Sequence, residues 1–108
     1  MRYTLLLILF FSASAYAQTS KQYDTITDPA IAVQKLHFAI SKDVTNSELY
    51  YLIGQRKFYL QEYDSCIFYS NKSIELLTKF KNNKILIQAL HIKGSAQYYL
   101  DDKIKAET

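Results

Sequence analysis

The chain has 108 residues, with 13 Lys and Arg, 10 Asp and Glu, two Gly, one Pro and a single Cys, and a formal net charge of +3. This length suits one small domain. The weak and scattered positive charge argues against a nucleic-acid or anionic-lipid partner, and a lone Cys excludes an intramolecular disulfide. The unusual part of the composition is the ten Tyr and six Phe without any Trp.

The first 17 residues predict a cleaved signal peptide. Arg2 supplies a positive charge, residues 5–11 form a short apolar core, and residues 15–17 (Ala-Tyr-Ala) have the small-x-small pattern of a cleavage site. An uncleaved anchor is the less favoured alternative, because the apolar run is much shorter than the roughly 20 residues that cross a bilayer. Loss of Arg2 leaves 12 Lys and Arg against 10 Asp and Glu. We therefore expect an exported product, periplasmic or extracellular, that has no stable membrane span.

Residues 18–27 are polar and hydroxyl-rich without a sustained period, which predicts a flexible leader before a helical domain over 28–108. Asp28 and Pro29 mark the start of the first helix, because Asp can cap orphan N–H groups and Pro suits the first helical position. Apolar residues then recur at helical spacing to about Lys42, at Ala32, Val33, Leu36, Ala39 and Ile40.

A second helix is predicted to run to about Gln61. Thr45 and Glu48 have the spacing of a capping box, with the Thr45 hydroxyl facing forward and the Glu48 carboxylate reaching back. Gly54 interrupts this helix and costs about 1 kcal/mol relative to Ala, so we expect a neighbouring helix to approach closely there.

A third helix is predicted from Tyr63 to about Phe80, with Asp64 as its N-cap and with Ile67, Ile74 and Leu77 facing inward. Cys66 falls on the same side, where a small residue allows close packing. We expect a buried, inert thiol rather than a reactive one, since buried Cys usually behaves as a small hydrophobe.

The remainder predicts a connecting turn over 81–84, a fourth helix from Ile85 to Leu100, a turn at residues 101–102, and the start of a fifth helix over 103–108. Acidic residues suit the beginning of a helix, so the Asp pair is interpreted as a cap rather than as a catalytic or metal site.

An internal repeat links the second and fourth helices. Residues 50–60 and 90–100 align at a spacing of forty, with three identities: Gly54 with Gly94, Tyr59 with Tyr99, and Leu60 with Leu100. A period of this length in a helical pattern is typical of stacked helical hairpins.

At these residues the chain resembles the tetratricopeptide repeat. Residues 50–76 resemble one complete repeat, and residues 90–106 resemble the first helix and the corner of another. The resemblance implies an all-α fold of antiparallel helical hairpins stacked as a short α-solenoid, incomplete at its C-terminus. Departures from the family pattern are the absence of Pro after Leu76, the presence of Ser70, Ser73 and Lys93, and a spacing longer than the usual thirty-four.

No arrangement of residues predicts catalysis. His37 and His91 lie on different helices, neither with a metal-ligand partner at helical spacing. Ser65 and Ser95 lack a nucleophile elbow and an identifiable base, and both glycines of the mature chain fall inside helices. We therefore expect a protein that is not an enzyme and that uses no cofactor or metal.

The tyrosine-rich helices suggest a binding surface. In the resembled family the concave face holds an extended peptide or a partner helix, and Tyr suits such contacts because it offers a large area and loses little rotamer entropy. The predicted partner-binding residues are Tyr51, Gln55, Phe58, His91, Ser95 and Tyr98. Tyr59 and Tyr99 are equally compatible with core packing and with binding. The places that hold Lys and Asn in carboxylate-gripping relatives are Tyr51 and Gln55 here, so that specificity is not expected.

The sequence therefore predicts a non-catalytic scaffold or adaptor that binds a protein or peptide. The alternative is the N-terminal sensory region of a membrane-spanning regulator, of the kinase or DNA-binding type, whose remainder is missing from this chain. An uncovered face on the fourth helix would give marginal stability, a homodimer through that helix, or dependence on a partner.

Overall fold

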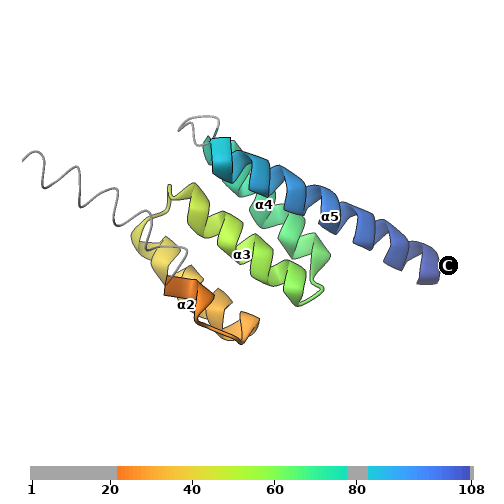
Figure 1. The fold of residues 1–108 in the computed structure, drawn as a ribbon, viewed down its shortest axis with the longest axis horizontal. Coiled ribbons are helices and arrows are strands. Elements are labelled where there is room, and N and C mark those ends of the chain that lie inside the picture. Colours follow the sequence, from red (N-terminus) through yellow and green to blue (C-terminus); the bar gives the residue numbers. More distant parts are fainter. Residues whose placement is uncertain (1–21, 78–82, 108) are drawn as a thin grey trace, which may run out of the picture.

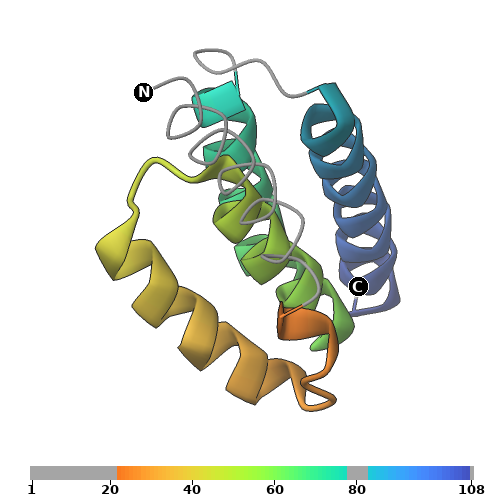
Figure 2. The same cartoon turned by 60° about the vertical axis from the view of Figure 1, so that its left-hand side comes forward.

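The computed structural model describes residues 22–77 and 83–107, and all regular structure in those ranges is helical. Four long helices follow one another: α2 (Pro29–Lys42), α3 (Ser47–Tyr59), α4 (Tyr63–Leu77) and α5 (Asn83–Glu107) (Figure 1). The predicted all-α class is confirmed. α3 contacts α2, α4 and α5, and α4 contacts both α3 and α5. Figure 2 shows α2 and α5 on opposite sides of the central α3–α4 pair.

Helix α2 begins and ends as its sequence predicts. The Asp28 carboxylate accepts a hydrogen bond from the Ala30 N–H at 2.9 Å, and Pro29 occupies the first turn. Ala32, Val33 and Leu36 are buried on the side toward the rest of the bundle.

Helix α3 is capped by Asn46, so the predicted Thr45 cap is wrong by one residue. The Asn46 amide oxygen accepts from the N–H groups of Glu48 at 3.1 Å and Leu49 at 3.4 Å. These are the donors that a helix leaves unpaired in its first turn. Thr45 is exposed and precedes the cap.

The C-terminus of α3 turns sharply at Gln61, which has φ 61°. The N–H of Gln61 donates to the Phe58 carbonyl at 3.0 Å, and the N–H of Glu62 donates to the Lys57 carbonyl at 2.9 Å. This pair of bonds is the Schellman pattern of a helix C-terminus. A Lys57–Glu62 ion pair at 2.6 Å adds to it.

Helix α4 begins at Tyr63, so Asp64 lies inside the first turn and is not the cap. The Glu62 carbonyl accepts the first bond, from the Cys66 N–H at 3.0 Å. Leu77 is buried, as predicted, whereas Ile67 and Ile74 are half-buried. The predicted end near Phe80 lies outside the described residues.

The close approach expected at Gly54 is confirmed. A Cβ atom there would lie 3.2 Å from the Ser70 Oγ and 3.4 Å from the Cys66 carbonyl oxygen of α4. Cys66, Ser70 and Ser73 are all fully buried, and the Ser73 hydroxyl donates to the Ser47 carbonyl at 2.9 Å. The serines that depart from the repeat pattern are therefore the small residues that let α3 and α4 pack closely.

Helix α5 runs unbroken from Asn83 to Glu107, which corrects two predictions. Residues 83–84 belong to the helix rather than to a connecting turn, and no turn occurs at Asp101. The Gln97 side-chain amide donates to the Asp101 carboxylate at 3.1 Å, a contact at the i,i+4 spacing that supports a continuous helix. Figure 1 shows α5 extending beyond the α3–α4 pair.

Residues 22–27 are part of the folded unit, which differs from the flexible leader that their composition predicted. Residues 22–24 form a helical turn, and the Tyr23 side chain is only 6% exposed. Tyr23 belongs to the same core cluster as Val33, Leu36 and Leu52. The rest of the predicted leader and the predicted signal peptide lie outside the described residues.

Candidate functional site

A groove of about 440 Å³ lies between α3 and α5. Five of the six predicted binding residues line it: Tyr51, Gln55, Phe58, His91 and Ser95. The other lining residues are Tyr59, Ile87, Gln88 and Ile92. The sixth predicted residue, Tyr98, is 69% exposed and does not line the groove. The structure thus brings together predicted residues of α3 and α5 that are more than thirty positions apart in the sequence.

Helical periodicity explains why these residues share one surface. On α3 the lining residues follow Tyr51 at steps of four, seven and eight, and on α5 Ile87, His91 and Ser95 are four apart. Residues at such spacings lie on one face of a helix. Contact between α3 and α5 sets the two faces side by side.

The exposure of three tyrosines differs from what the sequence led us to expect. Tyr51, a preferred contact residue, is only 8% exposed and forms part of the core as well as the groove wall. Tyr59 and Tyr99, for which core packing was an equal alternative, are 61% and 46% exposed. Only the edge of Tyr51 can meet a ligand, whereas most of Tyr59 is accessible.

An aromatic cluster of Phe58, Tyr63, Tyr98 and Tyr99 joins α3, α4 and α5 at one end of the groove. Phe58 meets Tyr63 and Tyr99 edge-on, with ring centroids 5.6 and 5.7 Å apart. Tyr63 and Tyr99 stack at 5.6 Å with an interplanar angle of 17°, and Tyr98 meets Tyr99 edge-on at 5.5 Å. These contacts hold Phe58 in place from one side. Tyr98 belongs to this cluster rather than to the groove.

Burial raises the pKa of the Tyr51 hydroxyl above its ordinary value, and the neighbouring Tyr59 acts in the same direction. The positive charge of Arg56 opposes the shift in part. Tyr51 therefore keeps its proton at neutral pH and can both donate and accept a hydrogen bond.

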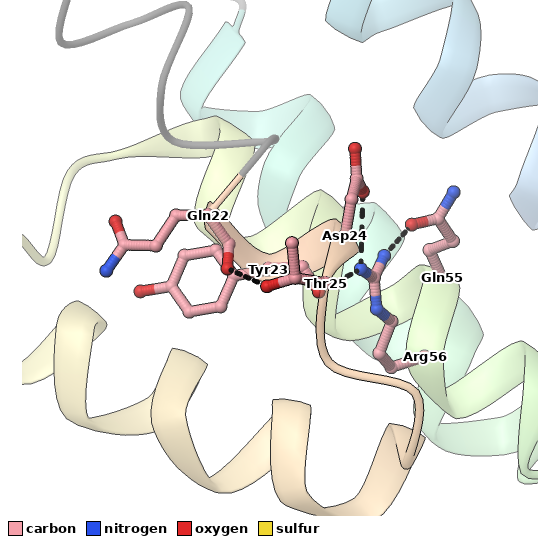
Figure 3. A network of polar contacts seen from close by, with 6 residues as sticks. All are labelled: Gln22, Tyr23, Asp24, Thr25, Gln55 and Arg56. Atoms are coloured by element: carbon pink, nitrogen blue, oxygen red, sulfur yellow. Dashed lines mark hydrogen bonds and ion pairs between the residues drawn. The ribbon is translucent and has the colours of Figure 1, made fainter.

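Arg56 is a feature of the site that the sequence analysis missed. Its guanidinium is buried, donates to the Tyr23 carbonyl at 3.1 Å, and lies 3.5 Å from the Asp24 carboxylate. It also donates to the Gln55 side-chain oxygen (Figure 3). Arg56 follows Leu52 by four residues and Ile53 by three, so its place on the buried stripe of α3 was the available signal.

The other residues with potential chemistry do not gather at one point. His37 of α2 meets the Tyr69 hydroxyl of α4 at 3.5 Å, whereas His91 lies on α5 and lines the groove. Within residues 22–77 and 83–107 there is no group of three His, Cys, Asp or Glu side chains that could hold a metal ion. Burial raises the pKa of the Cys66 thiol, with partial compensation from the Ser70 hydroxyl. None of the helices in these ranges has the length and apolarity needed to span a bilayer.

The chain matches no protein-family model, no curated protein and no solved structure. The groove and its residues are therefore the basis on which a function can be argued.

Proposed function

We propose that this protein is a non-catalytic scaffold that binds a protein or peptide segment in the groove between α3 and α5. The observation that carries the proposal is the convergence of five predicted contact residues from two helices on one groove. Its volume lies in the range of ligand-binding clefts, and it combines apolar and aromatic walls with a few polar groups, as binding sites do.

We further propose that α3 and α4 form one unit of a tetratricopeptide-like array and that α5 begins the next. The close helix contact at Gly54 and the packing of α5 against both α3 and α4 support this interpretation. Such arrays bind ligands on the face formed by the first helix of each unit, which here would be α3 and α5. The observed groove lies between these two helices.

The proposed setting is outside the cytoplasm, on the basis of the signal-like residues 1–17. Expression of the full chain in its source cells and mass measurement of the exported product test this. A mature N-terminus near Gln18 is the expected result, and recovery of an unprocessed cytoplasmic chain would reject export.

A blocking substitution tests the groove. Ser95→Arg places a long charged side chain in the groove, and Gln97→Arg adds the same side chain to an exposed position of the same helix. Partners captured by the tagged native chain from its own compartment are identified and then purified. We expect Ser95→Arg to abolish their binding and Gln97→Arg to leave it within about twofold.

Single alanine variants map the extent of the surface. We expect His91→Ala to weaken partner binding and Phe68→Ala, an exposed aromatic position outside the groove, to have no effect. Tyr98→Ala decides whether the aromatic cluster extends the site. Unchanged binding by a folded Ser95→Arg protein would remove the groove from consideration as the partner site.

A further inference from the structure

We propose that Arg56 fixes the Gln55 side chain as a hydrogen-bond donor, and that the groove therefore takes main-chain carbonyl groups of an uncharged, proline-rich peptide in extended form. This inference rests on the proposed function of the groove and adds the chemical class of its ligand. It also assigns Gln55 as a specificity-determining residue and Arg56 as the residue that positions it.

The orientation of the Gln55 amide follows from the chemistry of its neighbour. A guanidinium carries only N–H donors and no acceptor, so it can face only the oxygen of an amide. The Gln55 Oε1 atom accepts from Arg56, and Figure 3 shows the amide nitrogen on the side away from the guanidinium. The two N–H bonds of that nitrogen remain for other partners.

Arg56 itself is held rigidly enough to impose this orientation. Its side chain is 7% exposed, its Nη2 group donates to the Tyr23 carbonyl at 3.1 Å, and the Asp24 carboxylate lies 3.5 Å away. Arg remains protonated at all ordinary pH values. Rotation of the Gln55 amide would set N–H against N–H beside a buried charge, which is an unfavourable contact.

The lining of the groove selects against charged ligands. None of its nine lining residues is Asp, Glu, Lys or Arg, so the groove wall supplies no permanently charged partner for an ionic group, which would lose water on entering. The ligand atom that faces Gln55 must be an acceptor, and every residue of a peptide supplies one in its main-chain carbonyl oxygen.

Proline-rich segments fit these demands. Each Pro has a carbonyl acceptor but no N–H that would need an acceptor in the groove. The rings of Tyr51, Phe58 and Tyr59 line the α3 side, and aromatic-lined grooves recognise polyproline II helices, which are already extended before binding. From residue 51 to residue 59 a helix rises about 12 Å, which corresponds to about four residues of polyproline II.

The probe for this proposal is acetyl-hexaproline amide, a peptide that has no charge and no main-chain N–H group in its proline residues. We expect its titration into the ¹⁵N-labelled full chain to give saturable shifts of the Gln55 side-chain amide resonances. We expect Gln55→Glu and Gln55→Met to weaken binding at least tenfold, because both remove the donor and only the first adds charge.

Gln34→Glu is the matched control, since it makes the same chemical change at an exposed position of α2 that does not line the groove. We expect it to weaken hexaproline binding less than threefold. The Gln55→Glu protein should stay folded because the new carboxylate can pair with Arg56, and circular dichroism checks this. Absence of hexaproline binding at millimolar concentration, or equal binding by the wild type and both Gln55 variants, would overturn the inference.

Failure of this inference can be told from failure of the proposed function. If Ser95→Arg abolishes capture of the natural partner while hexaproline does not bind, the groove is a binding site for another kind of segment. If Ser95→Arg leaves partner capture unchanged, the groove function itself fails.

Discussion

Helices α3 and α5 carry the same sequence pattern but have different surroundings. Gly54 on α3 is buried against α4, whereas a Cβ at the matching Gly94 of α5 would meet nothing within 4 Å. Among the described elements, α3 packs against α2, α4 and α5, while α5 packs mainly against α4 and less extensively against α3. The glycine therefore marks the face of the helix that has no side chain at that position. A neighbouring helix approaches that face closely at Gly54 but not at Gly94.

The two copies of the pattern also differ seven residues after their glycines. At Gln61 the chain leaves α3 through the Schellman turn, and α4 packs back onto it. At the matching Asp101 the chain continues as helix. The same register in a repeat can thus be a turn in one copy and a helix interior in the other.

The largest expected effect tests the two glycines with one substitution. Gly54→Leu should lower the free energy of unfolding by about 3 kcal/mol, because its side chain would overlap the Cys66 and Ser70 backbone region of α4. Gly94→Leu should raise stability by up to about 1 kcal/mol, since Leu is the better helix former in open space. Urea unfolding of both variants measures the difference, and equal destabilisation at the two sites would contradict the assigned environments.

The next largest effect concerns the packing of the N-terminal turn, residues 22–24, against the core that includes α3. Tyr23→Ala should cost about 2 kcal/mol, because it removes a buried ring from the core. Thr25→Ala, at the exposed position that follows this turn, should change stability by less than about 0.5 kcal/mol. Urea midpoints for the two variants make the comparison. If Tyr23→Ala were as mild as Thr25→Ala, residues 22–27 would behave as the leader that their composition suggested.

Local patterns predicted well wherever one interaction dominates. The start of α2, the turn after α3 and the close contact at Gly54 each depend on a few adjacent residues or on one helix face. The N-cap of α3 was assigned one residue too early. The side chains of Thr45 and Asn46 can both accept hydrogen bonds from N–H groups of the first turn, and the sequence does not show which of them does so.

The features that sequence reasoning missed depend on contacts between distant segments. Burial of Tyr23 and its hydrogen bond with Arg56 require the N-terminal turn to lie on α3, which the composition of residues 18–27 does not indicate. Similarly, five groove residues were predicted from the resemblance together with helical spacing, but neither shows that Tyr98 lies outside the groove, where its ring meets Tyr99.

Smaller effects of opposite sign are expected at the matching positions Gln61 and Asp101. Gln61→Gly should raise stability by about 0.5 to 1 kcal/mol, because Gly adopts positive φ without the cost that a Cβ imposes. Asp101→Gly should lower it by about 1 kcal/mol, because Gly weakens a helix interior and the contact with Gln97 is lost. Thermal unfolding of both variants gives the signs. A gain in both would indicate that α5 turns at Asp101 in solution.

The smallest effect is a pH dependence that arises in the first turn of α3. Burial raises the pKa of Glu48 above its ordinary value of 4.5, although Lys84 of α5 acts in the opposite direction. The folded state therefore binds a proton more readily than the unfolded state, and ionisation of Glu48 reduces stability as the pH rises from 4.5 through the folded-state pKa. Glu48→Gln should consequently be slightly more stable than the wild type at pH 7, with the difference vanishing below pH 4.5.

Asp102→Asn provides the comparison on α5, because it removes the same charge from an exposed carboxylate. Urea unfolding of the wild type and both variants at pH 7 and pH 4 separates the local effect of burial from the change in net charge. A benefit from Glu48→Gln that persists or grows at pH 4 would mean that desolvation of the carboxylate is not its cause. A benefit at pH 7 that is no larger than that of Asp102→Asn would mean that attraction to Lys84 offsets the burial of Glu48, so that the α3–α5 contact stabilises the charged form.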